Sequence, residues 1–242
     1  MARGFSVKRS WRRSLCVILL GVCCAGPGHT ESVFSLGLRT DLPLGIGSIS
    51  LFGASQLLSP DADEQQPASQ INSLDRAVIR PYDDRLDSIG TYLAYAALVT
   101  PALTGFCDPD FPDQSMTHAA MYAEAFLLTY GTKDLLKAIV SRHRPYTYAG
   151  PIPESEEGDY HNSFPSGHTS LAFLAATFLS YTFAQEYPES SWRIPIAVGS
   201  FTLATTIGAA RVLSGSHFVT DVLAGAAIGV FWGWLVPRIH LR

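Results

Sequence analysis

Five apolar segments occupy most of residues 88–236 of this 242-residue chain and limit the folds that are open to it. They are residues 88–106, 117–141, 169–184, 194–210 and 218–236. None alternates apolar and polar residues as strands do, and each is long enough for a helix. A weaker, glycine-rich apolar segment at residues 42–58 precedes them. The sequence therefore predicts an all-α bundle of about five or six helices, with the active site at one end.

The composition indicates that this bundle is embedded in a membrane. Charged residues make up 16% of the chain, below the roughly 25% that is usual for soluble domains. Phe231, Trp232 and Trp234 near the end of the last segment are typical of an interfacial aromatic belt. Charged residues inside segment 117–141, Glu124 among them, keep a soluble exported protein open as an alternative.

The N-terminus has the pattern of an export signal. Five basic residues precede a short apolar run at residues 15–24, which is too short to span a bilayer. We predict a signal peptide at residues 1–25, with an uncleaved anchor as the alternative. Residues 26–87 are then an apolar segment and a polar linker, and residues 88–242 form the helical catalytic domain.

Removal of the signal peptide would make the chain strongly acidic. The remaining residues would hold 12 basic and 21 acidic side chains, a net charge of −9. This charge argues against nucleic acid as a partner. Any bound phosphate would have to be held by a local cluster of cations.

Three short motifs supply such a cluster together with two histidines and a carboxylate. They are Lys137-x6-Arg144-Pro145, Pro165-Ser166-Gly167-His168 and Arg211-x5-His217-x3-Asp221. Lys137 and Arg144 are seven residues apart, so on a helix they share one face. Ser166 can cap a helix whose first N–H groups, Gly167 included, attract a phosphate.

Each motif alone also has a purely structural explanation. Basic residues complement the dipole at the end of a helix, which is also how we interpret Arg142 and His143. The second motif can be a simple helix start, although this leaves His168 unexplained. His217 and Asp221 can be a local pair, or the Asp221 carboxylate can accept from one imidazole nitrogen and leave the other as a nucleophile.

The order of the segments also predicts that the motifs meet. Two apolar segments separate the second motif from the third, so the chain crosses twice and returns to the same side. With a cleaved signal, the site lies outside the cytoplasm if residues 42–58 do not span the membrane, and inside if they do. Arg238 and Arg242 favour a cytoplasmic C-terminus. We expect a bacterial inner-membrane protein with its active site facing the periplasm.

Taken together, the three motifs resemble those of the type 2 phosphatidic acid phosphatase superfamily. This superfamily includes bacterial lipid phosphatases, periplasmic acid phosphatases and vanadium haloperoxidases. The resemblance runs from Lys137 to Asp221. It departs from the usual pattern at Ala210, where the third motif normally has a serine before its arginine. This departure removes a supporting hydrogen bond and no catalytic group.

The resemblance implies a role for each motif residue. His217 would be the nucleophile that forms a phosphohistidine, Asp221 would orient it, and His168 would be the general acid and base. The phosphate would be bound by Lys137, Arg144, Ser166, Gly167 and Arg211. No metal or other cofactor is expected. The substrate would be a lipid phosphate monoester or diphosphate in a membrane; a soluble exported acid phosphatase and a vanadium-dependent haloperoxidase are the alternatives.

Overall fold

The computed structural model describes residues 33–58, 65–102 and 111–242, with no side-chain detail for residues 111–113. The predicted signal peptide lies outside these residues. The described part is almost entirely helical, and its only β-pairing is an isolated bridge between Phe34 and Leu241. The all-α prediction is therefore confirmed for the described part of the chain.

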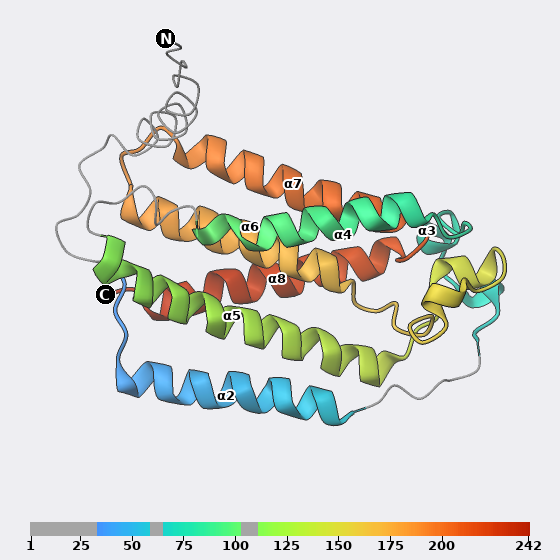
Figure 1. Ribbon diagram of the computed structural model, residues 1–242, viewed down its shortest axis with the longest axis horizontal. Coiled ribbons are helices and arrows are strands. Elements are labelled where there is room, and N and C mark those ends of the chain that lie inside the picture. The colour runs from blue at the N-terminus through green and yellow to red at the C-terminus, as the bar shows by residue number, and fades with distance from the viewer. Residues whose placement is uncertain (1–32, 59–64, 103–110) are drawn as a thin grey trace, which may run out of the picture.

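The described residues contain six long helices that lie side by side along one common direction (Figure 1). Their bounds are α2 Leu38–Leu57, α4 Asp84–Leu98, α5 Phe111–Val140, α6 Gly167–Glu186, α7 Arg193–Leu213 and α8 Val219–Ile239. Shorter turns of helix lie in the connections: η1 Ala68–Gln70, α3 Ser73–Arg76, η3 Pro145–Tyr148 and η4 Glu154–Glu156.

The predicted segments correspond to these helices, with shifted ends. The largest difference is in α4, which begins at Asp84 rather than at residue 88 and ends at Leu98. The Asp83 side chain caps its start by accepting from the N–H of Leu86 at 3.1 Å. Pro101 lies in a 3-10 turn at residues 100–102, after the α-helix has ended. The α-helix is therefore shorter than predicted, and the last predicted residues, 103–106, lie outside the described residues.

The closest contact in the bundle is between α6 and α8. Gly225, Gly229 and Gly233 recur every four residues and form a bare strip along α8. A Cβ atom added to Gly229 would lie 2.2 Å from the carbonyl oxygen of Ser170 on α6, and one added to Gly225 would lie 2.5 Å from that of Ser166. The two backbones are therefore in direct contact, as at small-residue interfaces between membrane helices.

The alternating direction of the helices brings the predicted motifs to one end of the bundle. The C-terminal ends of α5 and α7 and the N-terminal ends of α4, α6 and α8 meet there, beside α3 and the short η helices (Figure 1). The N-terminal end of α2 and the chain's C-terminus lie at the opposite end, where the backbone N–H of Ser35 donates to the His240 carbonyl.

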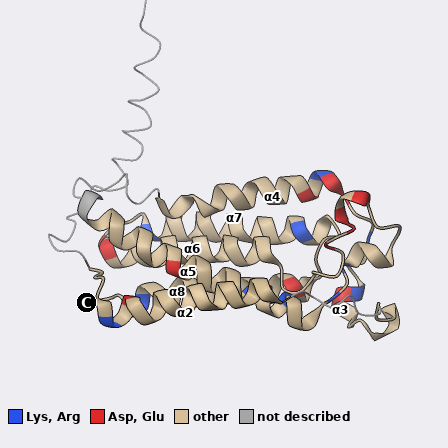
Figure 2. Cartoon of the chain, turned by 60° about the horizontal axis from the view of Figure 1, so that its bottom comes forward, with Lys and Arg blue, Asp and Glu red and all other residues tan. Residues whose placement is uncertain are grey.

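The outside of the bundle is apolar. Leu38, Tyr92, Ile194 and Leu223, from four different helices, are 83%, 71%, 74% and 59% exposed. Charged side chains gather toward the two ends of the bundle and are sparse between them (Figure 2). Within the described residues, α7 and α8 are long and apolar enough to cross a membrane.

The α6–α8 contact yields a stability prediction. Replacement of Gly229 with Ala should push the two backbones apart and destabilise the fold by about 1–3 kcal/mol, as overpacking does. Gly199→Ala on α7 is the matched control, because no atom lies within 4 Å of its added Cβ. Thermal unfolding of the purified variants measures the difference. Equal unfolding temperatures for the two variants would show that this contact is not tight.

Candidate active site

The predicted site residues converge on His217, which lies between α7 and α8 and is 1% exposed. Burial holds the pKa of His217 well below its usual value of 6.5, and the charges of Arg144, Arg211 and Lys137 lower it further. These three cations are the ones that the sequence motifs singled out. Burial and the positive charges nearby both disfavour the protonated ring, so the imidazole is neutral before any anion binds.

The hydrogen bonding of His217 fixes which of its ring nitrogens is free. Nδ1 lies 2.7 Å from the backbone carbonyl oxygen of Ser163. A carbonyl oxygen only accepts, so Nδ1 carries the proton and the neutral ring leaves a lone pair on Nε2. This is the protonation state that a nucleophilic histidine needs.

We expected the Asp221 carboxylate to accept a hydrogen bond directly from the His217 imidazole. It does not. Its Oδ2 atom lies 3.8 Å from Nδ1 of His217, beyond hydrogen-bonding distance. The same oxygen accepts from the Ser163 hydroxyl at 2.6 Å and from the N–H of Phe218 at 2.8 Å. The helix α8 begins at Val219, after His217, so the two residues do not share a helix face. Ser163 contacts both residues, because its hydroxyl donates to Asp221 and its carbonyl oxygen accepts from His217.

Arg142 is part of this network, although its sequence position indicated only a basic helix end. Its Nη1 atom lies 2.6 Å from Oδ1 of Asp221, and its Nη2 atom lies 2.9 Å from Oδ2 of Asp75. Both carboxylates are fully buried. Burial alone would raise the pKa of Asp75, but hydrogen bonds from Thr220 and Arg142 outweigh it and lower that pKa. One arginine therefore serves two buried carboxylates.

Arg211 is held in place from α4 and keeps a donor free. Its Nη2 atom pairs with Oδ1 of Asp87 at 2.6 Å, and its Nη1 atom donates to the Thr91 hydroxyl at 3.3 Å. Its buried Nε–H has no hydrogen-bond partner among the described residues. An unsatisfied buried donor is costly, and an anion bound beside it would remove that cost.

Arg144 and Lys137 are also held by acceptors at the site end of the bundle. Arg144 is 4% exposed, pairs with the Asp159 carboxylate and donates from Nε to the Asp159 carbonyl at 2.9 Å. The Nζ atom of Lys137 donates to the carbonyl of Asn162 at 2.9 Å. Both acceptors belong to the acidic connection between α5 and α6.

The second motif forms the start of α6. Ser166 is the N-cap residue, but its hydroxyl pairs with that of Thr169 at 2.9 Å instead of capping the backbone. Gly167 is the first residue of α6, so its N–H has no partner within the helix. Nε2 of His168 lies 3.3 Å from the Thr91 hydroxyl, which links it to the Arg211 side.

A further cation that the motifs do not include lies beside Gly167. Lys133 is 6% exposed, and its Cδ atom would be 3.2 Å from a Cβ added to Gly167. Its Nζ atom pairs with Asp134 and lies 3.5 Å from the centre of the Tyr130 ring. Lys133 precedes Lys137 by four residues, a spacing from which a shared helix face could have been predicted.

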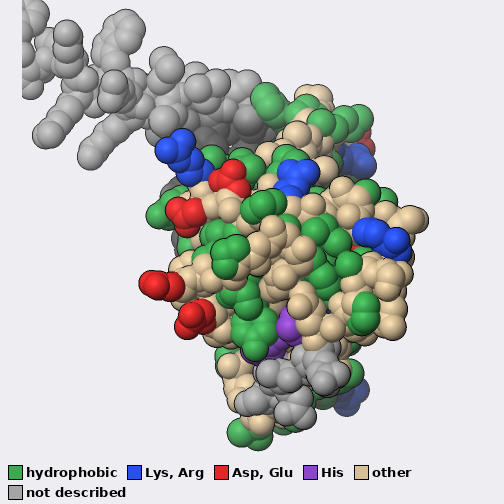
Figure 3. Space-filling model, turned by 90° about the vertical axis from the view of Figure 1, so that its right-hand side faces the viewer, with side chains coloured by type: hydrophobic (Ala, Val, Ile, Leu, Met, Phe, Trp, Pro, Cys, Tyr) green, Lys and Arg blue, Asp and Glu red, His purple; other side chains and the backbone are tan. Residues whose placement is uncertain are grey.

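Figure 3 looks onto the end of the bundle that carries these residues. Acidic side chains lie along one edge of this face, and histidine atoms reach the surface in one place. The cations that surround His217 are mostly buried beneath this face. The site is therefore a buried group of cations beneath a surface that carries acidic, basic and apolar side chains.

Comparisons with known proteins assign the chain to a family. A family model described as the PAP2 superfamily matches residues 118–242, just over half of the chain. Lipid A 1-phosphatase of Porphyromonas gingivalis is 37% identical over 79 residues, which cover 33% of this chain and 16% of that protein. Phosphatidylglycerophosphatase B of Bacillus subtilis is 33% identical over 115 residues, which cover 46% and 54%. The chain thus spans about half or less of the length of these relatives.

A solved structure is similar along most of the chain. It is the transmembrane PAP2 type phosphatidylglycerolphosphate phosphatase from Bacillus subtilis. The TM-score is 0.44 and the sequence identity 23%, with 82% of this chain and 94% of that chain covered.

The Arg142 network predicts a large effect of a substitution outside the three motifs. Arg142→Met should destabilise the fold by about 3–5 kcal/mol, because it leaves two buried carboxylates without a counter-ion. Arg85→Met, at an exposed arginine near the start of α4, is the control. Chemical denaturation measures both. Equal stability of the two variants would mean that Asp75 and Asp221 do not depend on Arg142.

Proposed function

The chain belongs to the PAP2 superfamily, and we propose that it hydrolyses a lipid phosphate monoester or diphosphate through a phosphohistidine on His217. The observation that supports this most is the free Nε2 of a buried imidazole whose Nδ1 is committed to the Ser163 carbonyl and whose pKa is lowered by burial and by the charges of two arginines and a lysine. A neutral imidazole in a cationic centre can attack an anionic phosphorus.

In the first step, Nε2 of His217 attacks the phosphorus atom and the bond to the leaving oxygen breaks. Charge on the three equatorial oxygens is stabilised by positive groups. Arg211 would offer its unpartnered Nε–H, and Gly167 would offer the first N–H of α6. Arg144, Lys137 and the Ser166 hydroxyl complete the proposed phosphate site. The imidazole becomes positive as it binds phosphorus, and Asp221 compensates this charge through Ser163.

His168 is the proposed general acid. Its Nε2 atom would carry a proton to the leaving oxygen once the negative substrate is bound. In the second step, the neutral ring takes a proton from the water that attacks the phosphohistidine, and inorganic phosphate leaves. Both steps balance without an external reductant, oxidant or metal, so we propose that catalysis is metal-independent.

A lipid substrate is supported by the relatives and by the surface of the bundle. The relatives named above are lipid A 1-phosphatase and phosphatidylglycerophosphatase B. Large apolar side chains on the outside of α2, α4, α7 and α8 need a covering other than water. We propose that this surface lies in the bacterial inner membrane, which would bring lipid headgroups to the level of the site.

The proposed periplasmic orientation is supported by basic residues at the end of the bundle opposite the site. Arg238 and Arg242 lie there and favour the cytoplasm. The helix α2 lies lengthwise beside α5 (Figure 1). If the signal peptide is cleaved and α2 crosses the membrane as a sixth helix, the site would face the cytoplasm instead. The proposed orientation follows Arg238 and Arg242, because basic residues favour the cytoplasm whether or not the signal peptide is cleaved.

The reaction class predicts a specific inhibitor and cofactor profile. The purified chain should release phosphate from lipid phosphates or diphosphates in EDTA as well as without it. Vanadate should inhibit, because its trigonal-bipyramidal form resembles the transition state. A screen of lipid and water-soluble phosphoesters tests this and shows which class is preferred. Loss of all activity in EDTA, restored by a divalent ion, would contradict the proposal.

The role of His168 predicts a dependence on the leaving group. His168→Ala should slow hydrolysis of an alkyl phosphate by roughly 10²–10⁴, the usual worth of a general acid. The loss should be much smaller with p-nitrophenyl phosphate, whose leaving group needs little protonation. Steady-state rates with both substrates measure the ratio. Equal losses for the two substrates would exclude His168 as the acid.

The orientation predicts which loops a membrane-impermeant reagent can reach. In a chain with its native cysteines replaced by serine, Ser155→Cys at the site end should react with an impermeant maleimide in intact spheroplasts. Arg242→Cys should react only after lysis. The reverse pattern would place the site in the cytoplasm, and labelling of both positions without lysis would indicate a soluble exported protein.

A further inference from the structure

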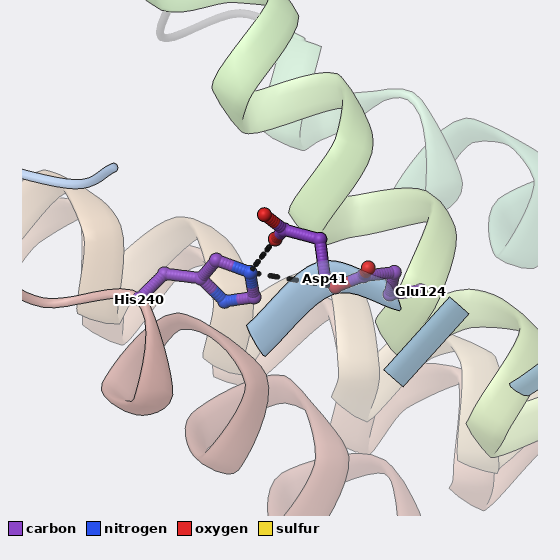
Figure 4. A group of neighbouring side chains, drawn as sticks. All are labelled: Asp41, Glu124 and His240. Carbon is purple, nitrogen blue, oxygen red and sulfur yellow. Dashed lines mark hydrogen bonds and ion pairs between the residues drawn. The ribbon is translucent and has the colours of Figure 1, made fainter. Parts of the chain in front are cut away.

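Three side chains from distant parts of the sequence meet at the end of the bundle opposite the proposed active site. Asp41 lies in the first turn of α2, Glu124 lies on α5, and His240 directly follows α8 (Figure 4). One potential ligand atom of each lies within 4.8 Å of the other two. At 1.5 Å per residue, α8 places His240 about 28 Å from Asp221. The cluster is therefore separate from the phosphate chemistry.

The hydrogen bonding of His240 leaves one ring nitrogen facing two acids. Nδ1 lies 2.8 Å from the carbonyl oxygen of Val236 and must carry a proton. Nε2 lies 2.7 Å from Oδ1 of Asp41 and 3.6 Å from Oε2 of Glu124. In a neutral ring, the lone pair on Nε2 would face the lone pairs of both carboxylates. Either a proton or a metal ion has to lie between them.

Glu124 distinguishes these two possibilities. Its Oε2 atom is buried and has no hydrogen-bond partner among the described residues. A second proton on His240 would satisfy Asp41, but 3.6 Å is too long for a hydrogen bond to Glu124. Glu124 as a whole is only 9% exposed, so its unpaired carboxylate oxygen is costly. A metal ion would satisfy all three side chains at once.

We propose that Asp41, Glu124 and His240 bind a divalent transition-metal ion, with zinc as the first candidate. Imidazole together with carboxylates suits zinc, whereas magnesium and calcium prefer oxygen ligands alone. Ligand atoms on one tetrahedral zinc ion stand roughly 3.3 Å apart, between the two separations seen here. The Val236 carbonyl on Nδ1 is the kind of outer partner that a metal-bound histidine commonly has. Water would fill the fourth position.

The position of the cluster gives the ion a structural role. It joins α2 and α5 to the C-terminus, where the segment before α2 already pairs with residues 240–242. An ion bound only by the folded chain stabilises the fold by mass action. Removal of the ion should therefore lower the unfolding temperature and leave the distant phosphate site intact.

The test uses the full chain purified in detergent and stripped with a chelator. Zinc should bind at one equivalent in isothermal titration and raise the unfolding temperature, whereas magnesium should do neither. Glu124→Gln, which keeps the size of the side chain, should weaken zinc binding at least tenfold. Glu157→Gln, an exposed acid in the connection near the active site, is the matched control and should bind zinc like the unmodified chain.

The unmodified protein alone is sufficient if Glu124→Gln does not fold. Absence of one-to-one zinc binding in the stripped protein would overturn the proposal. So would equal zinc affinity of the Glu124→Gln and Glu157→Gln variants. Phosphate release by the stripped protein, assayed below its unfolding temperature, should persist, which separates this site from the proposed catalytic one.

Discussion

The direct backbone contact between α6 and α8 is the constraint on which the proposed site depends. α6 begins with Ser166, Gly167 and His168, and α8 begins just after His217. Because glycines let these helices touch, the N–H of Ser166 can donate to the Asp221 carbonyl at 3.0 Å. The proposed phosphate-binding turn and the proposed nucleophile are thus joined at the level of the main chain. A bulkier strip on α8 would separate them.

The second constraint is that a buried charge needs a partner of opposite sign. The fold provides one by pairing each arginine of the site with a carboxylate. Arg211 pairs with Asp87, Arg144 with Asp159, and Arg142 with both Asp75 and Asp221. These carboxylates hold the guanidinium groups in place, so the proposed binding of a phosphate would need little reorganisation. Asp159 is 48% exposed at its side chain, so it is the acid that a substrate can most readily displace from its arginine.

The sequence predicted the helices and the motif residues because both follow from local patterns. Apolar segments of helical length give the bundle, and the two crossings between the motifs bring them to one end. The groups that hold the motif residues could not be predicted in this way. Ser163, Asp75 and Asp87 act across 54 or more positions of sequence, through contacts that only the packed helices create. The prediction of a direct hydrogen bond between Asp221 and His217 was wrong because the spacing of two residues does not fix where a helix begins. The helix α8 begins only after His217.

The central claim is that His217 becomes covalently phosphorylated during turnover. It is tested most directly by rapid mixing of the enzyme with substrate, quenching in alkali, where phosphohistidine is stable, and mapping of the phosphopeptide by mass spectrometry. A phosphoryl group should appear on His217, disappear as substrate is exhausted and be absent from His217→Ala. A phosphoryl group on another residue, or one that persists in His217→Ala, would contradict it.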